Sequence, residues 1–188
     1  GMFSGRFVIP LHNEQGELVG YAGRSLDAQP PRYLFPPAAK GFHKSALLFN
    51  WHRVRKRIAA GERLVLVEGL FDCMHVEQAG YASVAVMGSS LSAQQEQMLV
   101  QSGSRLVLLF DGDSAGRKAT DQCLRRLARH VSVEVIILAE GRQPDMLSSQ
   151  QLKELLRGSQ RRNNPGTIRG TLAEGEALRR DDSLRGFH

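Results

Sequence analysis

Three carboxylates follow two short apolar runs of the sequence. Glu68 comes directly after the run 64–67, and Asp111 and Asp113 come after the run 106–110. Continuous apolar runs of this length are typical of strands that are buried on both faces of a parallel sheet. Because the carboxyl ends of parallel strands meet at one edge of a sheet, where α/β proteins bind ligands, we expect the three acids to share one site.

Glu68, Asp111 and Asp113 would repel one another if they shared a site without a counter-charge. A divalent cation that takes hard oxygen ligands is the usual remedy, and Mg2+, or Mn2+ in its place, is the leading candidate. A simpler interpretation stays open, in which the two aspartates only form a turn ahead of a helix, with Asp113 or Ser114 as the N-cap. The matching strand, acid and glycine arrangement at Glu68 favours the metal site.

The elements that must position these acids alternate along the chain. We expect strands over 63–67, 82–87, 105–110 and 132–138, and helices over 70–79, 92–102, 114–129 and 146–156. Such alternation predicts an α/β fold with a parallel four-stranded sheet and helices on both faces. The segment Ser92-Ala-Gln-Gln95 has the form of a capping box for the second of these helices.

A small β-hairpin is expected ahead of the sheet. Segments 6–12 and 17–24 have the composition of strands and flank the turn-forming segment 13–16. A helix is expected over 51–60, with Asn50 as its N-cap. We therefore divide the chain into a basic N-terminal hairpin and helix subdomain, 1–60, an α/β domain, 61–157, and a basic polar tail, 158–188, in which 172–180 has helical composition.

The net charge of +6 is unevenly distributed along the sequence. Residues 1–60 contain nine Lys and Arg against three Asp and Glu, residues 61–156 contain nine against twelve, and residues 157–188 contain seven against four. An acidic middle between basic flanks suits a metal site that faces a polyanion. A solvated basic surface without a partner is the plainer interpretation and stays open.

Cysteine usage and hydropathy narrow the class of protein further. Cys73 and Cys123 are isolated and lack the paired spacing of a zinc site, so we expect two buried, reduced thiols. No stretch approaches roughly 18 uninterrupted apolar residues, and the N-terminus lacks the apolar core of a signal peptide. We expect no membrane partner and a cytoplasmic location.

Two motifs resemble the Toprim signature that bacterial DnaG-type primases, topoisomerases and some nucleases share. They are Glu68-Gly69 followed by Asp72, and the run from Asp111 to Gly116. Further segments resemble the catalytic core of DnaG-type primases, namely 7–11, 20–24, 31–34 and 42–44. The resemblance extends from about Arg6 to Leu156, which is most of the chain.

The resemblance implies a Mg2+-dependent nucleotidyltransferase that acts on nucleic acid, with 61–157 as its Toprim domain. Asp111 and Asp113 would hold the cation, and Glu68 would act as a general base or as a further ligand. Asp72 and Asp145 would be additional metal ligands.

The resemblance also assigns the basic residues. Arg24, Arg32 and Lys44 match positions where the family places cations near nucleic acid or the incoming nucleotide. The expected partners are therefore single-stranded DNA and nucleotides, with other replication proteins as further candidates. The loop 87–90 matches a polar loop that lines the family's site.

Two other functions stay open. A Toprim nuclease would use the same acids to activate water and would not need the nucleotide-binding cations. A catalytically weak nucleic-acid-binding module is the third hypothesis, because the zinc-binding and helicase-interacting modules that accompany primases have no counterpart in this sequence.

One position departs from the family's pattern. Primases carry two aspartates that bracket a proline after the last strand, whereas this chain has Gln143-Pro144-Asp145. A neutral amide contributes no charge, and Arg142 beside it adds a repulsive one. We therefore expect one divalent ion at Asp111 and Asp113, and a second ion that is weakly bound or absent.

Overall fold

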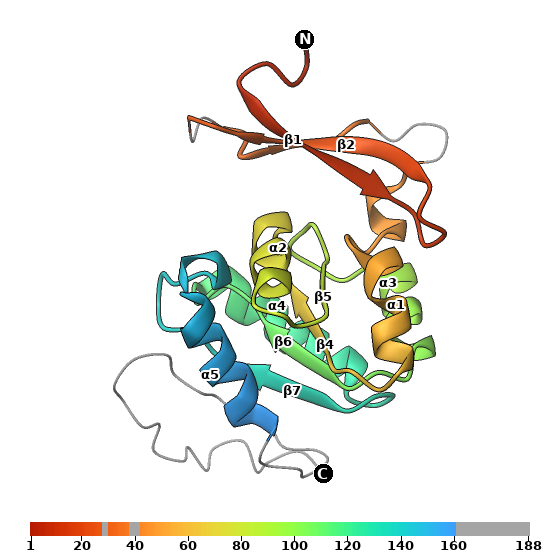
Figure 1. The fold of residues 1–188 in the computed structure, drawn as a ribbon, viewed down its shortest axis with the longest axis vertical. Coiled ribbons are helices and arrows are strands. Elements are labelled where there is room, and N and C mark those ends of the chain that lie inside the picture. Colours follow the sequence, from red (N-terminus) through yellow and green to blue (C-terminus); the bar gives the residue numbers. More distant parts are fainter. Residues whose placement is uncertain (28–29, 38–41, 161–188) are drawn as a thin grey trace.

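Four short strands form the central sheet of the computed structural model, which describes residues 1–27, 30–37 and 42–160 (Figure 1). They are β4 (Leu64–Val67), β5 (Ser83–Ala85), β6 (Leu106–Leu109) and β7 (Val133–Ile136). All neighbouring strands pair in parallel, in the order β5-β4-β6-β7. Every residue of β4 and β6 is buried, as strands covered on both faces require. The predicted parallel four-stranded sheet is confirmed.

Helices cover both faces of this sheet, because successive side chains of a strand point to opposite sides. The odd-numbered residues of β4 and β6 pack with α2 (Leu70–Gln78) and α5 (Ser149–Gln160). Their even-numbered residues pack with α1 (Trp51–Ala59), α3 (Ala93–Gln101) and α4 (Ser114–Leu127). The helices thus form two outer layers, as predicted.

A second, antiparallel sheet lies beside the first (Figure 1). The predicted hairpin is present as β1 (Arg6–His12) and β2 (Leu18–Ser25). The sequence did not predict β3 (Tyr33–Leu34), which adds a third strand to the edge of β2. The inner side chains Ile9, Leu11 and Ala22 join the same apolar cluster as α2, so the two sheets share one core.

The sequence was wrong about two details at element boundaries. Asn50 is the N-cap residue of α1, as predicted, but its conformation is left-handed, with φ of 71°, and its side chain does not cap the helix. Its Nδ2 instead donates to the Ser83 carbonyl oxygen at 3.0 Å, which ties α1 to β5. The last predicted helix begins late, because a 3-10 turn, η2 (Pro144–Met146), precedes α5.

Three remaining expectations concern the thiols, the membrane and the tail. Cys73 and Cys123 are buried and form no disulfide, as predicted. Among the described residues no helix is both long and apolar enough to cross a membrane. The tail from residue 161 onward, with the helix expected over 172–180, lies outside the described residues.

The predicted capping box is present at the start of α3, and its residue Gln95 also makes hydrogen bonds to two loops. The buried Gln95 accepts from the Ser92 N–H through its Oε1 at 2.9 Å. Its Nε2 donates to the carbonyl oxygens of Leu47 and Val86, at 2.7 and 3.1 Å. We expect Gln95→Leu to lower the free energy of unfolding by about 2 kcal/mol, because buried polar groups lose their partners.

Chemical denaturation of the parent and the variant measures this loss. The matched control is Gln94→Leu, which makes the same change at an exposed position of the same helix. A loss at Gln95→Leu no larger than that at Gln94→Leu would contradict the assigned role.

Candidate active site

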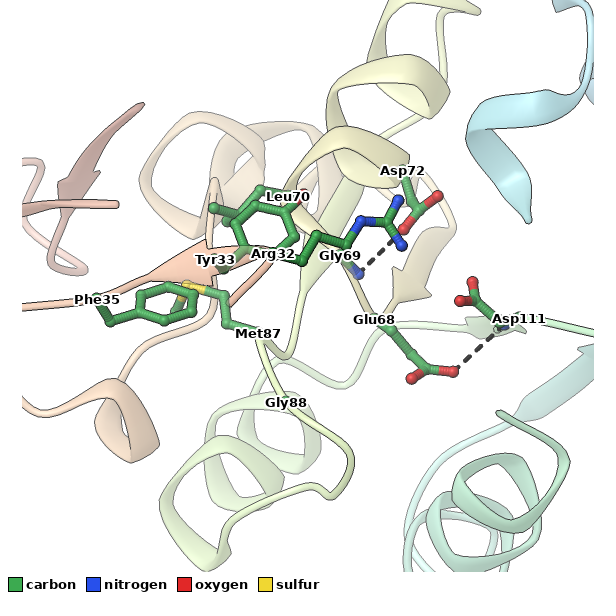
Figure 2. Close-up of a pocket in the computed structure, with 10 residues that line it drawn as sticks. All are labelled: Arg32, Tyr33, Phe35, Glu68, Gly69, Leu70, Asp72, Met87, Gly88 and Asp111. Atoms are coloured by element: carbon green, nitrogen blue, oxygen red, sulfur yellow. Dashed lines mark hydrogen bonds between the residues drawn. The ribbon is translucent and has the colours of Figure 1, made fainter. Parts of the chain in front are cut away.

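The carboxyl edge of the parallel sheet brings three acids together. Glu68 follows β4 and Asp111 follows β6, and the Asp111 backbone N–H donates to Glu68 Oε1 at 3.3 Å (Figure 2). Asp72 lies in the first turn of α2, where its Oδ2 accepts from the Gly69 N–H at 3.2 Å. Its Oδ1 accepts from the Asp145 N–H at 3.1 Å. Glu68, Asp72 and Asp111 all line one cavity of about 230 Å³.

Two glycines permit this close packing. A Cβ atom on Gly116 would lie 2.2 Å from the Asp111 carbonyl oxygen and 2.9 Å from Glu68 Oε1. A Cβ atom on Gly112 would lie 2.0 Å from the Ala139 carbonyl oxygen. Both distances to backbone oxygens are far below van der Waals contact, so the motif needs glycine at these positions in order to hold the acids where they are.

The opposite wall of the cavity comes from the N-terminal segment and the loop after β5. Arg32, Tyr33 and Phe35 approach from β3 and its flanks, and Met87 and Gly88 approach from the loop (Figure 2). The cavity therefore has an acidic end and an aromatic and apolar end. The loop that the resemblance placed at the site does line it.

Burial and mutual repulsion shape the electrostatics of the acids. Burial, followed by repulsion from Asp111, raises the pKa of Glu68 to about 7. Burial, followed by repulsion from Asp145 and Asp111, raises the pKa of Asp72 to about 6, against a lowering contribution from Arg32. Burial also raises the pKa of Asp111, although a hydrogen bond from Gln143 opposes the rise. The site therefore attracts positive charge.

The other two predicted metal ligands, Asp113 and Asp145, do not line the cavity. Asp113 is exposed and is the N-cap of α4, where its Oδ1 accepts from the Gly116 N–H at 2.7 Å. The turn interpretation thus describes that hydrogen bond correctly. Asp145 Oδ2 lies 3.6 Å from Arg24. Within 1–27, 30–37 and 42–160, no three His, Cys, Asp or Glu side chains converge as a ready-made metal site.

The three predicted cations differ in their surroundings. Arg32 is exposed and lines the cavity. The Arg24 guanidinium lies 3.9 Å from the ring centroid of Phe71 and pairs with Asp145, so protein groups already hold it. The Lys44 Nζ lies 4.9 Å from the ring centroid of Phe35.

Sequence reasoning missed the contact that Gln143 makes. It singled out this residue only for the charge it lacks, whereas Gln143 Nε2 donates to Asp111 Oδ2 at 2.6 Å. It also gave no role to Tyr33, Phe35 and Phe71, which surround the cations. Aromatic side chains at such spacing are more often part of a core, so the sequence carried no signal for them.

The sequence models of two protein families match separate parts of the chain. Residues 1–55 match the N-terminal domain of the DNA primase catalytic core, and residues 65–148 match a Toprim-like domain. This is a Toprim-domain protein that resembles the catalytic core of DnaG-type primases. The two matched regions correspond to the two sheets, so the cavity of this primase-like core lies between them.

Relatives and solved structures agree with this assignment. The chain is 39% identical over 145 residues to a DNA primase of Staphylococcus aureus, and 40% identical over 120 residues to one of Deinococcus radiodurans. These alignments cover 76% and 63% of this chain, but 24% and 21% of the relatives. The chain thus spans about a quarter of the length of the curated relatives it matches.

Two solved primase structures are similar to this chain in fold as well as in sequence. The structure of the Aquifex aeolicus primase zinc-binding and RNA polymerase domains superimposes with a TM-score of 0.74 at 30% identity, over 83% of this chain and 40% of that one. The DnaG primase catalytic domain bound to ssDNA superimposes with a TM-score of 0.71 at 28% identity, over 84% of this chain and 51% of that one. The primase-like fold covers both sheets.

The raised pKa of Glu68 predicts how stability depends on pH in buffer free of divalent metal. The folded pKa of about 7 lies above the ordinary 4.5, so the folded state holds the proton more tightly. The free energy of unfolding should therefore fall as the pH rises from about 5 to about 8. Glu68→Gln removes this group's titration and should make the fall shallower.

Denaturation midpoints across this pH range, measured in the presence of EDTA, check the prediction. The control Glu154→Gln makes the same change at an exposed position of α5. A pH dependence as steep in Glu68→Gln as in the parent would show that Glu68 ionises freely in the folded state.

Proposed function

We propose that this chain is the catalytic core of a primase-like nucleotidyltransferase, which joins nucleotides along a single-stranded DNA template. The observation that carries the proposal is that Glu68, Asp72 and Asp111 share one cavity with the exposed Arg32, which directly precedes β3 of the other sheet. Acids that attract a cation and a cation that attracts phosphate thus face the same space. This combination suits transfer of a phosphoryl group, which depends on positioning and charge stabilisation.

The donor atoms fit a hard divalent cation such as Mg2+ or Mn2+. Asp111 Oδ1 is buried and has no hydrogen-bond partner, so it is the oxygen available to an ion. Among the described residues no three His, Cys, Asp or Glu side chains lie close enough to hold a metal ion by themselves, which suits Mg2+, because this ion usually binds through one or two carboxylates and substrate phosphates. Asp111 and Asp113 would hold the ion, with Asp72 and Asp145 as further candidates. When bound, the ion would neutralise phosphate charge and polarise the reacting oxygen.

The protein's own groups would divide the remaining work. Glu68 Oε1 accepts the Asp111 N–H, which leaves Oε2 to take a proton from the attacking hydroxyl as its oxygen bonds to the α-phosphorus of the nucleotide and pyrophosphate leaves. Arg32 would bind a phosphate of the nucleotide or template across the cavity. Arg24 and Lys44 would add positive potential from behind the aromatic rings that they contact.

The proposed partners are single-stranded DNA and nucleotides, and one similar structure is a DnaG primase catalytic domain bound to ssDNA. Other replication proteins are further proposed partners. The proposed location is the cytoplasm, where such an activity would meet its template.

Incubation with single-stranded DNA, labelled nucleotides and Mg2+ or Mn2+ tests the activity. We expect extended products, and we expect Asp111→Asn to slow their formation by about 100-fold or more, because several kcal/mol of charge stabilisation are lost. Asp121→Asn is the matched control on the exposed face of α4. Shortened products would indicate the Toprim nuclease instead, and neither product would indicate a binding module.

The salt dependence of DNA binding tests the role of Arg32. We expect Arg32→Ala to reduce the slope of log affinity against log salt concentration by about 0.7, the contribution of one phosphate contact on a single strand. Fluorescence anisotropy with a labelled oligothymidylate measures this slope. Arg129→Ala removes the same charge from an exposed position of the molecule that does not line the cavity. An equal reduction in both variants would mean that Arg32 contributes only to a diffuse basic surface.

A further inference from the structure

We propose that Gln143 is a positioning residue whose carboxamide couples phosphate binding at Arg32 to cation binding at Asp111. The inference rests on the proposed function, which supplies the two ligands. It goes further by assigning to one neutral side chain the link between them.

The carboxamide of Gln143 bridges the two charged groups. Its Nε2 donates to Asp111 Oδ2 at 2.6 Å, and its Oε1 accepts from Arg32 Nη2 at 3.2 Å. The orientation of the amide follows from chemistry, since a guanidinium only donates hydrogen bonds and an ionised carboxylate only accepts them. The positive end of the amide dipole therefore faces Asp111, and its negative end faces Arg32.

The backbone around Gln143 is anchored, so its movable part is the side chain. The neighbouring Arg142 carbonyl oxygen accepts from the Gly112 N–H at 2.8 Å. The Gln143 carbonyl oxygen accepts from the Met146 N–H at 3.1 Å, and Pro144 beside it is buried. Rotation about the last side-chain bond of glutamine has a broad, roughly two-fold profile, so the carboxamide can turn over on a fixed base.

A cation at Asp111 disfavours the present orientation of the carboxamide. Asp111 Oδ1 is buried and free of partners, whereas Oδ2 faces the amide hydrogens of Gln143. An ion at this carboxylate would meet the positive end of that amide dipole. Turning the carboxamide over would present Oε1 to the ion and would take from Arg32 its acceptor on Gln143.

Arg32 would then be free to bind phosphate. It is exposed, so losing its acceptor leaves it in solvent at the cavity rather than buried without a partner. The coupling acts in the other direction too, since a phosphate that occupies Arg32 would release Gln143 Oε1 toward the ion. Coupling between two binding sites is reciprocal, so each ligand would strengthen the other.

A double-mutant cycle on Mn2+ affinity, measured by calorimetry with the metal alone, tests the link. The four proteins are the parent, Arg32→Met, Gln143→Met and the double variant. In the parent background Arg32→Met removes both a nearby positive charge and the donor that fixes the amide, whereas in the Gln143→Met background it removes only the charge. We expect the gain in Mn2+ affinity from Arg32→Met to be roughly threefold or more larger in the parent background.

The outcomes separate the inference from the proposed function. Equal gains in both backgrounds, together with Mn2+ binding that Asp111→Asn abolishes, would overturn the link and leave the proposed function standing. Mn2+ binding that Asp111→Asn does not affect would remove the cation site, and the link would fall with it.

A second test observes the Gln143 side chain of the parent protein directly by NMR. In EDTA, a short oligothymidylate should shift the side-chain amide resonances of Gln143 in a 15N-correlated NMR spectrum, because Arg32 leaves its acceptor. Gln143→Met identifies these resonances by their disappearance. Resonances that stay unchanged while backbone signals near Arg32 move would overturn the inference.

Discussion

Repulsion among carboxylates at the carboxyl edge of the parallel sheet is the constraint on which the site depends. Burial strengthens this repulsion, and it raises the pKa of Glu68, Asp72 and Asp111. Hydrogen-bond donors oppose this repulsion: backbone N–H groups donate to Glu68 and Asp72, and the Gln143 amide donates to Asp111. These neutral donors orient the acids without cancelling their charge, which leaves a strong attraction for a cation.

The N-terminal sheet supplies what the acidic sheet lacks. Its inner residues Ile9, Leu11 and Ala22 share a core with α2, so the hairpin is held against the domain that carries the acids. β3 pairs with β2 and brings Arg32 to the cavity, while Arg24 fixes the junction through Phe71 and Asp145. The candidate site therefore belongs to the two sheets together.

The sequence predicted those parts of the fold that local patterns specify. Buried apolar runs identified β4 and β6, and the glycines beside Glu68 and Asp111 indicated where the acids would meet. β3 was not predicted, because its two residues, Tyr33 and Leu34, are too few to show the alternation of apolar and polar side chains that indicates a strand. Asn50 was misjudged because its partner, the Ser83 carbonyl oxygen, is remote in sequence.

In the candidate site, too, the features set by local sequence were predicted and those set by remote contacts were not. Glu68 and Asp111 follow strands and were predicted to meet, whereas the bridge from Arg32 through Gln143 to Asp111 joins segments that are distant along the chain. Hydrogen bonds of this kind depend on how the two sheets pack against each other. The amino-acid composition and motif spacing of a short segment do not specify that packing. Only the packed structure reveals them.

The proposed function requires the two sheets to build one site for a cation and a phosphate. A crystal structure of the chain with Mn2+ and a non-hydrolysable nucleoside triphosphate would locate both ligands, because manganese is identified by its anomalous scattering. We expect a manganese peak about 2–2.6 Å from an oxygen of Asp111 and a phosphate in contact with Arg32. A manganese ion bound elsewhere, or a nucleotide that contacts only one of the two sheets, would contradict it.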